Sequence, residues 1–210
     1  MTAVALQVTE WMKGYLGFGV SDYDAGFIKG IEANAFFMHE MLIKIDDVDR
    51  FVSDPEHEAV MDGTIDFGAF GSGPRPVKGA SFKMFADSKT PGLKYMKYRM
   101  PLTTEKGQAM TVYGHKTIHN DKALDLWGDT TTLYTSIYAG NLTAPEPPAN
   151  VQPTHRGVIH IEKLDLVKSL MSFRSPGSTP IQAQQAMSTF GRFFLGNLWE
   201  IYGKLARVST

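Results

Sequence analysis

The sequence predicts an all-β, mainly antiparallel protein that folds as a single domain with one helix near its C-terminus. Two observations carry this prediction. From residue 35 onward, apolar and polar side chains alternate along short segments, as in half-buried strands. Turn residues separate these segments at intervals of roughly ten to fifteen residues, with no helical pattern between them. Such a series of strands predicts a meander that closes into a barrel.

The first 34 residues are rich in glycine and aromatic side chains. Because dense glycine breaks regular structure, we expect a short helix near residues 3–13 followed by a loop or irregular strand. The first clear strand is predicted at 35–45, where His39 falls in the apolar set. The run Asp46-Asp47-Val48-Asp49 then predicts a turn or an N-cap into a short helix through Phe51, and Pro55 predicts a further helix start.

The predicted barrel occupies residues 35–174. Its strands are expected at 35–45, 63–70, 77–86, 93–102, 108–119, 130–139 and 157–164. A proline-rich connector at 144–153 precedes the last strand, and residues 165–174 fit either a helix or a strand.

Residues 179–207 predict an amphipathic C-terminal helix that starts with Thr179 as N-cap and Pro180 at its first position. Apolar side chains recur along it at three- and four-residue spacing. This helix could pack over one end of the barrel, form a homodimer contact or lie on a membrane surface. Packing is favoured, since basic residues are few and do not follow one face.

Composition excludes several classes of protein. The net charge is −1, from 21 basic and 22 acidic residues, so nothing electrostatic points to a nucleic-acid partner. No cysteine is present, which excludes disulfides and thiolate chemistry. No signal-peptide pattern and no apolar run of about 18 residues occur, so no transmembrane segment is predicted and we expect a soluble, cytoplasmic protein.

The predicted strands 77–86, 93–102 and 108–119 each carry methionine, aromatic or other apolar side chains on one face. Methionine is flexible and suits an irregular apolar ligand. The predicted ligand-binding residues are Phe82, Met84, Met96, Tyr98, Met100, Met110, Trp127 and Tyr134. A barrel of about eight strands can either hold one small ligand or be filled by its own side chains, and both outcomes remain open here.

A second, polar cluster lies between residues 110 and 138, where two predicted strands flank a polar turn. Its candidate catalytic residues are Tyr113, His115, Asp125 and Asp129, and Arg99 of the strand predicted at 93–102 is a further candidate. On an inward face, His115 and Tyr113 could act as general acid and base, with an aspartate orienting the imidazole. The alternative, an outward strand face beside an ordinary turn, is favoured because alternation places these residues opposite the apolar set.

No metal site and no cofactor are predicted. His115 and His119 have the spacing of helical metal ligands, but on a strand their side chains would lie about 13 Å apart. No nucleotide-binding glycine motif and no nucleophile-elbow motif occurs.

Several segments together resemble an accessory domain found beside the flavin domain in large bacterial flavoproteins of the glucose-methanol-choline oxidoreductase class, of the cholesterol-oxidase-like kind. These segments are IKIDDVDRFVSDPEHEAVMDGTI (43–65), VKGASFKMF (77–85), KYMKYRM (94–100), GHKTIHND (114–121), LWGDTTTLY (126–134) and RGVIHIEKLDLVKSLMSFRSPG (156–177). The resemblance covers most of residues 35–202 but includes no flavin-binding segment. It implies a free-standing accessory module that handles apolar substrates, with a partner oxidoreductase, and it carries over no catalytic residue.

The resulting expectation is a β-barrel of the lipocalin or allene-oxide-cyclase type that binds a hydrophobic small molecule such as a lipid, sterol or polyketide. One alternative is a cofactor-independent isomerase or cyclase acting on an apolar substrate. It requires Tyr113, His115 or Arg99 to face the lumen together with Asp125 or Asp129. Another is a protein-interaction or assembly module that docks through the aromatic C-terminal helix.

Overall fold

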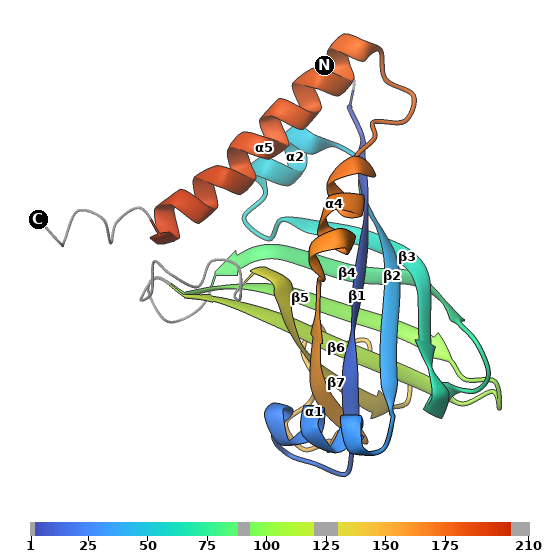
Figure 1. Ribbon diagram of the computed structural model, residues 1–210. Helices are drawn as coiled ribbons and strands as arrows, with labels where there is room; N and C mark the ends of the chain where they lie inside the picture. Colours follow the sequence, from blue (N-terminus) through green and yellow to red (C-terminus); the bar gives the residue numbers. More distant parts are fainter. Residues whose placement is uncertain (1–2, 88–92, 120–129, 203–210) are drawn as a thin grey trace, which may run out of the picture.

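The computed structural model describes residues 3–87, 93–119 and 130–202 as a closed antiparallel barrel of eight strands (Figure 1). The strands are β1 (Leu6–Phe18), β2 (Phe36–Ile45), β3 (Glu58–Phe67), β4 (Arg75–Asp87), β5 (Leu93–Thr103), β6 (Ala109–His119), β7 (Thr132–Ala139) and β8 (His155–His160). Each strand pairs with the next along the chain, and β8 pairs with β1 to close the sheet. The all-β antiparallel barrel is therefore confirmed.

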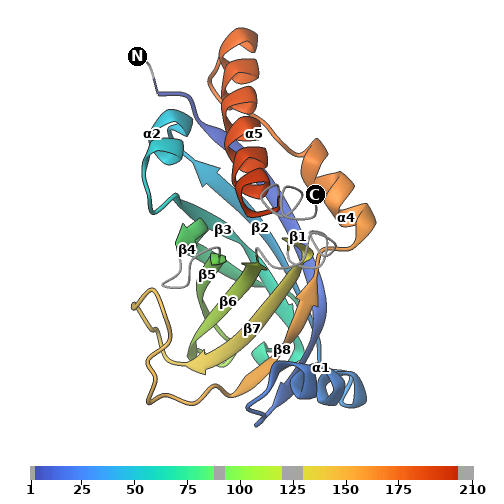
Figure 2. The same cartoon turned by 90° about the vertical axis from the view of Figure 1, so that its left-hand side faces the viewer.

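Helices lie at both ends of the barrel. Helix α1 (Tyr23–Glu32) lies at one end, whereas α2 (Val48–Ser53), α4 (Lys163–Met171) and α5 (Pro180–Tyr202) gather at the other (Figures 1 and 2). The 3₁₀ turn η1 covers Gly68–Phe70. The helical end is the one that matters for the site, because α4 and α5 stand over strand ends there.

The inner faces of the strands form the core, as their period-2 alternation predicts. On β5, for example, Met96, Tyr98 and Met100 are buried while the residues between them are partly exposed. Burying a large apolar side chain contributes about 1.5–3 kcal/mol, so these alternating sets fix both the register and the closure of the sheet.

The segment near residues 3–13, predicted to be a helix, is instead part of β1, so that prediction is wrong and the barrel begins at Leu6. Several glycines of this region are needed for close packing, whereas Gly19 lies in a turn with φ of +64°. A Cβ on Gly14 would lie 2.2 Å from the Val158 carbonyl oxygen, and one on Gly17 would lie 2.7 Å from the Gly26 carbonyl oxygen. Glycine therefore allows β8 and α1 to approach β1 directly.

The short helix after the second strand is confirmed as α2, with the Asp47 carboxylate accepting the Arg50 backbone N–H at 3.1 Å. The predicted helix start at Pro55 is wrong. His57 has φ of +42° in a turn, and β3 begins at the next residue. A left-handed residue ends helical continuation, so the chain reverses into the strand.

Near the C-terminus, the ambiguous stretch 165–174 is mostly helix α4, and β8 ends at His160 rather than at residue 164. Helix α5 begins at Pro180, and the Thr179 hydroxyl accepts the Gln182 N–H at 3.3 Å. The predicted positions 203–207 lie outside the described residues.

Candidate functional site

The largest cavity described has a volume of about 870 Å³ and lies where α4 and α5 stand over the barrel. Most of its lining is apolar. Its described lining residues are Val8, Glu10, Ile43, Phe82, Met84, Met96, Tyr98, Lys116, Thr130, Thr131, Ile161, Leu166, Ser169, Leu170, Phe173, Met187, Phe190, Gly191, Phe194 and Leu195. Strands thus supply one wall and the two helices supply the other.

Aromatic packing holds α5 against the barrel beside this cavity. The Phe194 ring lies 5.4 Å from Phe85 of β4, and Phe190 lies 6.3 Å from Phe51 of α2. Contacts between tilted rings at these distances contribute beyond their buried area.

Around the opening, Leu170, Met187 and Leu195 line the cavity and are also substantially exposed. The opening is thus surrounded by large apolar side chains, which water does not solvate well.

Four polar side chains meet inside the barrel beneath the helices; we call them the Glu10 group. They are Glu10 of β1, His39 of β2, Tyr98 of β5 and Lys116 of β6. The Lys116 ammonium lies 2.9 Å from Glu10 Oε2, and the Tyr98 hydroxyl donates to the same oxygen at 3.3 Å. Lys116 also stands over the Tyr98 ring, 5.5 Å from its centroid. Side chains from three other strands thus converge on the Glu10 carboxylate.

The charge state of the carboxylate follows from these neighbours. Burial alone would raise the pKa of Glu10, but the Lys116 ammonium and His39 outweigh it and lower the pKa to about 2. Burial and the Glu10 carboxylate raise the pKa of Tyr98 well above its usual value. At neutral pH the group therefore holds an ionised Glu10 and a protonated Tyr98 that donates to it.

His39 is the least satisfied member of the Glu10 group. Its side chain is fully buried, and neither ring nitrogen has a hydrogen-bond partner among the described residues. Its Nε2 lies 3.5 Å from Glu10 Oε1, which also lacks a hydrogen bond. This distance is beyond that of a normal hydrogen bond, so the contact is electrostatic.

The cavity takes in Phe82, Met84, Met96 and Tyr98 of the predicted ligand-binding residues. The other predicted residues lie elsewhere. Met100 is fully buried in the core, and Met110 is partly buried and packs against the core. Tyr134 points out of the barrel, toward Tyr23 of α1. Trp127 lies outside the described residues.

The predicted catalytic residues that the structure describes lie on the outer face of the barrel. Tyr113 donates its hydroxyl to the Ala144 carbonyl at 2.7 Å, and Arg99 donates to the Leu142 carbonyl at 3.4 Å. His115 stacks on Tyr134, with ring centroids 5.4 Å apart. The isomerase hypothesis required these side chains to face the lumen, and that condition is not met. Asp125 and Asp129 lie outside the described residues.

Tyr113 and His115 do line a separate outer groove of about 630 Å³, formed with α1 and the proline-rich connector. Burial, Lys97 and Arg156 lower the pKa of His115, and burial raises the pKa of Tyr113. The groove therefore keeps both side chains uncharged at neutral pH.

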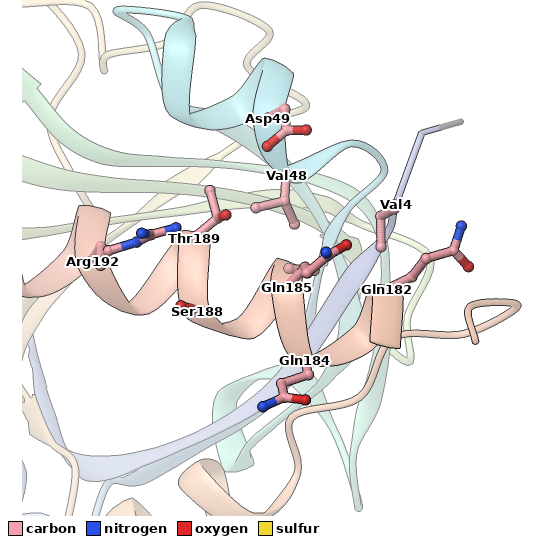
Figure 3. Close-up of a pocket in the computed structure, with 10 residues that line it drawn as sticks. Val4, Val48, Asp49, Gln182, Gln184, Gln185, Ser188, Thr189 and Arg192 are labelled. Atoms are coloured by element: carbon pink, nitrogen blue, oxygen red, sulfur yellow. The ribbon is translucent and has the colours of Figure 1, made fainter. Parts of the chain in front are cut away.

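A third hollow, of about 430 Å³, lies between α2 and α5 (Figure 3). Figure 3 shows Asp49 on α2 and Thr189 and Arg192 on α5 among its lining side chains. Most of its lining residues are polar, whereas those of the cavity over the barrel are mainly apolar.

Sequence reasoning missed Glu10 and Lys116, although a signal for both was present. Each charged residue falls among the apolar residues that share one face of its strand. Glu10 lies two positions from Val8 and from Met12, and Lys116 lies two positions from Ile118. A charged residue in the inward phase of a strand is costly unless it is paired, and it therefore indicates a buried partner.

Comparison with family models, with curated proteins and with solved structures finds no match to this chain. Within the described ranges, no helix has both the length and the apolar character needed to cross a membrane.

Proposed function

We propose that the protein binds a hydrophobic small molecule, such as a lipid, sterol or polyketide, in the cavity between the barrel and helices α4 and α5. The observation that carries this proposal is the cavity itself, which measures about 870 Å³ and has mainly apolar walls with a few convergent polar groups. Cavities that bind small ligands usually measure about 300–1,000 Å³ and have the same composition.

The proposal extends to the type of barrel and to its biological context. A closed eight-stranded barrel with a ligand at one end is the arrangement used by lipocalin-like and allene-oxide-cyclase-like proteins. The resemblance to a domain beside a flavin domain supports an accessory role in an oxidoreductase pathway.

Binding is favoured over isomerase or cyclase chemistry by the state of Glu10. A general base works best when its pKa lies near the working pH, whereas the pKa of Glu10 is lowered to about 2. Lys116 and Tyr98 could polarise a carbonyl group, and this keeps catalysis as the second candidate. A catalyst would then need a base other than Glu10.

The first test is native mass spectrometry of the purified protein compared with its denatured mass. We expect extra mass that disappears on denaturation, because an apolar ligand captured in the cavity should persist through purification. Identifying that ligand would define its chemical class.

A matched pair of glycines on α5 tests the location of the site. Gly191 lines the cavity and Gly196 does not, and a Cβ on either would meet no atom within 4 Å. Gly191→Phe should fill part of the cavity and weaken ligand binding at least about tenfold, since overpacking typically costs about 1–3 kcal/mol.

Gly196→Phe is the control, with the same change in helix propensity and no effect expected on binding. Dissociation constants for the recovered ligand, or for Nile red, would be compared between the two variants. Equal affinities in both would place the ligand outside this cavity.

A further inference from the structure

We infer that the ligand has an apolar body with one neutral oxygen, a hydroxyl or a carbonyl, which binds at Lys116 in the Glu10 group. This inference rests on the proposed function and names the chemical class of ligand for the same cavity. It follows from three properties of the lining: where its polar side chains lie, how their charges balance and which hydrogen bonds they leave open.

The polar side chains that line the cavity are unevenly distributed. The ionisable side chains Glu10, Tyr98 and Lys116 lie together on the inner faces of three strands. The other polar lining residues are Thr130, Thr131 and Ser169, and α5 contributes mainly apolar side chains such as Phe190 and Phe194. A ligand that fills the cavity therefore meets polar groups at its barrel end and apolar walls along its length. Such a lining selects a molecule with one polar end.

The charges of the cavity lining then restrict that polar end. Lys116 has 2% of its side chain exposed and Glu10 has 11%, and they form an ion pair at 2.9 Å. The two charges cancel. A ligand carboxylate would bring a second negative charge next to Glu10, and a buried charge without its own partner costs several kcal/mol. A neutral end group avoids that cost.

Hydrogen-bonding capacity further selects oxygen as the polar atom. An ammonium group has three N–H donors. Among the described residues, Glu10 is the acceptor that the structure places within hydrogen-bond distance of Lys116 Nζ, while the Tyr98 ring faces the ammonium as a cation–π partner. A hydroxyl or carbonyl oxygen would accept one of the remaining donors. Hydrogen bonds to charged groups contribute about 1.5–3 kcal/mol, more than neutral ones.

The test compares three probes that share one chain length: hexadecane, hexadecanol and palmitic acid. Each would displace Nile red from the wild-type protein at about pH 8, where the free fatty acid is ionised. We expect hexadecanol to bind about tenfold more tightly than hexadecane, and palmitate to bind more weakly than hexadecanol.

A double variant assigns this preference to the polar group. Glu10→Gln with Lys116→Met removes both charges together, so neither is left buried alone. It should keep its affinity for hexadecane and lose the preference for hexadecanol. The wild-type ranking tests the inference even if this variant does not fold.

The possible failures are distinguishable. If palmitate binds most tightly, or if hexadecanol and hexadecane bind the wild type equally, the inference is wrong while hydrophobic binding stands. If none of the three probes displaces Nile red and no captured ligand is found, the proposed function itself fails.

Discussion

Glu10 and Lys116 form an ion pair inside a barrel whose buried side chains are mainly apolar. Lys116 is among the largest fully buried side chains of the described residues, and its one carboxylate partner is Glu10 at 2.9 Å. The desolvation of two buried charges roughly offsets their attraction, so the intact pair adds little net stability. Loss of Lys116 alone is a different matter, because Glu10 then keeps a largely buried negative charge without the ammonium that balances it.

We therefore predict that Lys116→Met lowers the free energy of unfolding by about 3–5 kcal/mol, whereas Glu10→Gln with Lys116→Met stays within about 1 kcal/mol of the wild type. Urea unfolding would measure both. Lys44→Met is the control: Lys44 pairs with Asp62 at the surface, where its side chain is 32% exposed, and the expected loss is below about 1 kcal/mol. A single variant as stable as the double one would contradict the prediction.

The same residues explain why the site was only partly predictable. Alternation correctly identified Met96 and Tyr98 as inward residues and correctly favoured an outward position for His115. It did not reveal Glu10, because the glycine-rich N-terminal segment predicts a short helix near residues 3–13, which in the structure belong mostly to β1. It also could not show that α4 and α5 complete the cavity, since their placement depends on packing between segments far apart in the sequence.

At the scale of elements, α1 depends on glycines to reach the barrel: Gly26 and Gly30 on the helix and Gly17 on β1. Gly26 of α1 faces Gly17 of β1, and a Cβ on Gly26 would lie 2.2 Å from the Arg156 carbonyl oxygen of β8. Backbone atoms cannot yield at that distance as a flexible side chain can. The helix and the two strands that close the barrel therefore fit together only without a side chain at this position.

Gly26→Ala should accordingly lower the free energy of unfolding by about 1–3 kcal/mol, despite the better helix propensity of alanine. Gly68→Ala is the matched control, since a Cβ there meets no atom within 4 Å. Urea denaturation of the two variants would measure the difference. Similar stability in both would show that α1 moves away without cost.

Among the elements, β4, β5 and β6 were predicted within a few residues of their bounds because they alternate regularly and end at turn residues. The strand predicted at 63–70 is β3 at Glu58–Phe67, followed by a 3₁₀ turn. Its start was misplaced because the Pro55 turn resembles a helix N-terminus in sequence alone.

For the whole molecule, the Glu10 group links four of the eight strands and couples the stability of the barrel to acid. The pKa of Glu10 is lowered from 4.5 to about 2 in the folded protein. Because the folded pKa is the lower one, the contribution of Glu10 is fully present above about pH 4.5 and is lost as the pH falls toward about 2. The shift corresponds to about 3 kcal/mol.

The wild type should therefore lose about 3 kcal/mol more stability than the Glu10→Gln, Lys116→Met variant between pH 5 and about pH 2. Urea midpoints across that interval would measure this difference. The variant is also the control for other carboxylates such as Asp62 and Asp165, whose pKa values are lowered too, because it retains them. Parallel pH profiles would show that Glu10 does not titrate as described.

The surface of the helical end also bears on assembly. Ile181 of α5 and Met171 of α4 are 70% and 81% exposed. A homodimer or a partner oxidoreductase that covers this end stays a prediction from the sequence. Phe194, by contrast, already packs against Phe85 within the chain.

The closure of the barrel by β1 and β8 has a kinetic consequence. The pairing of Lys13 with His160 joins a strand near the start of the chain to one synthesised much later. The other strand pairs join neighbours along the chain, whereas the β1–β8 contacts form only after the entropy of closing this long loop has been overcome. During translation, β1 would pair with β2 early and keep its other edge open until His160 has left the ribosome. A nascent chain of this protein is therefore most exposed to edge-to-edge aggregation just before the last strand arrives.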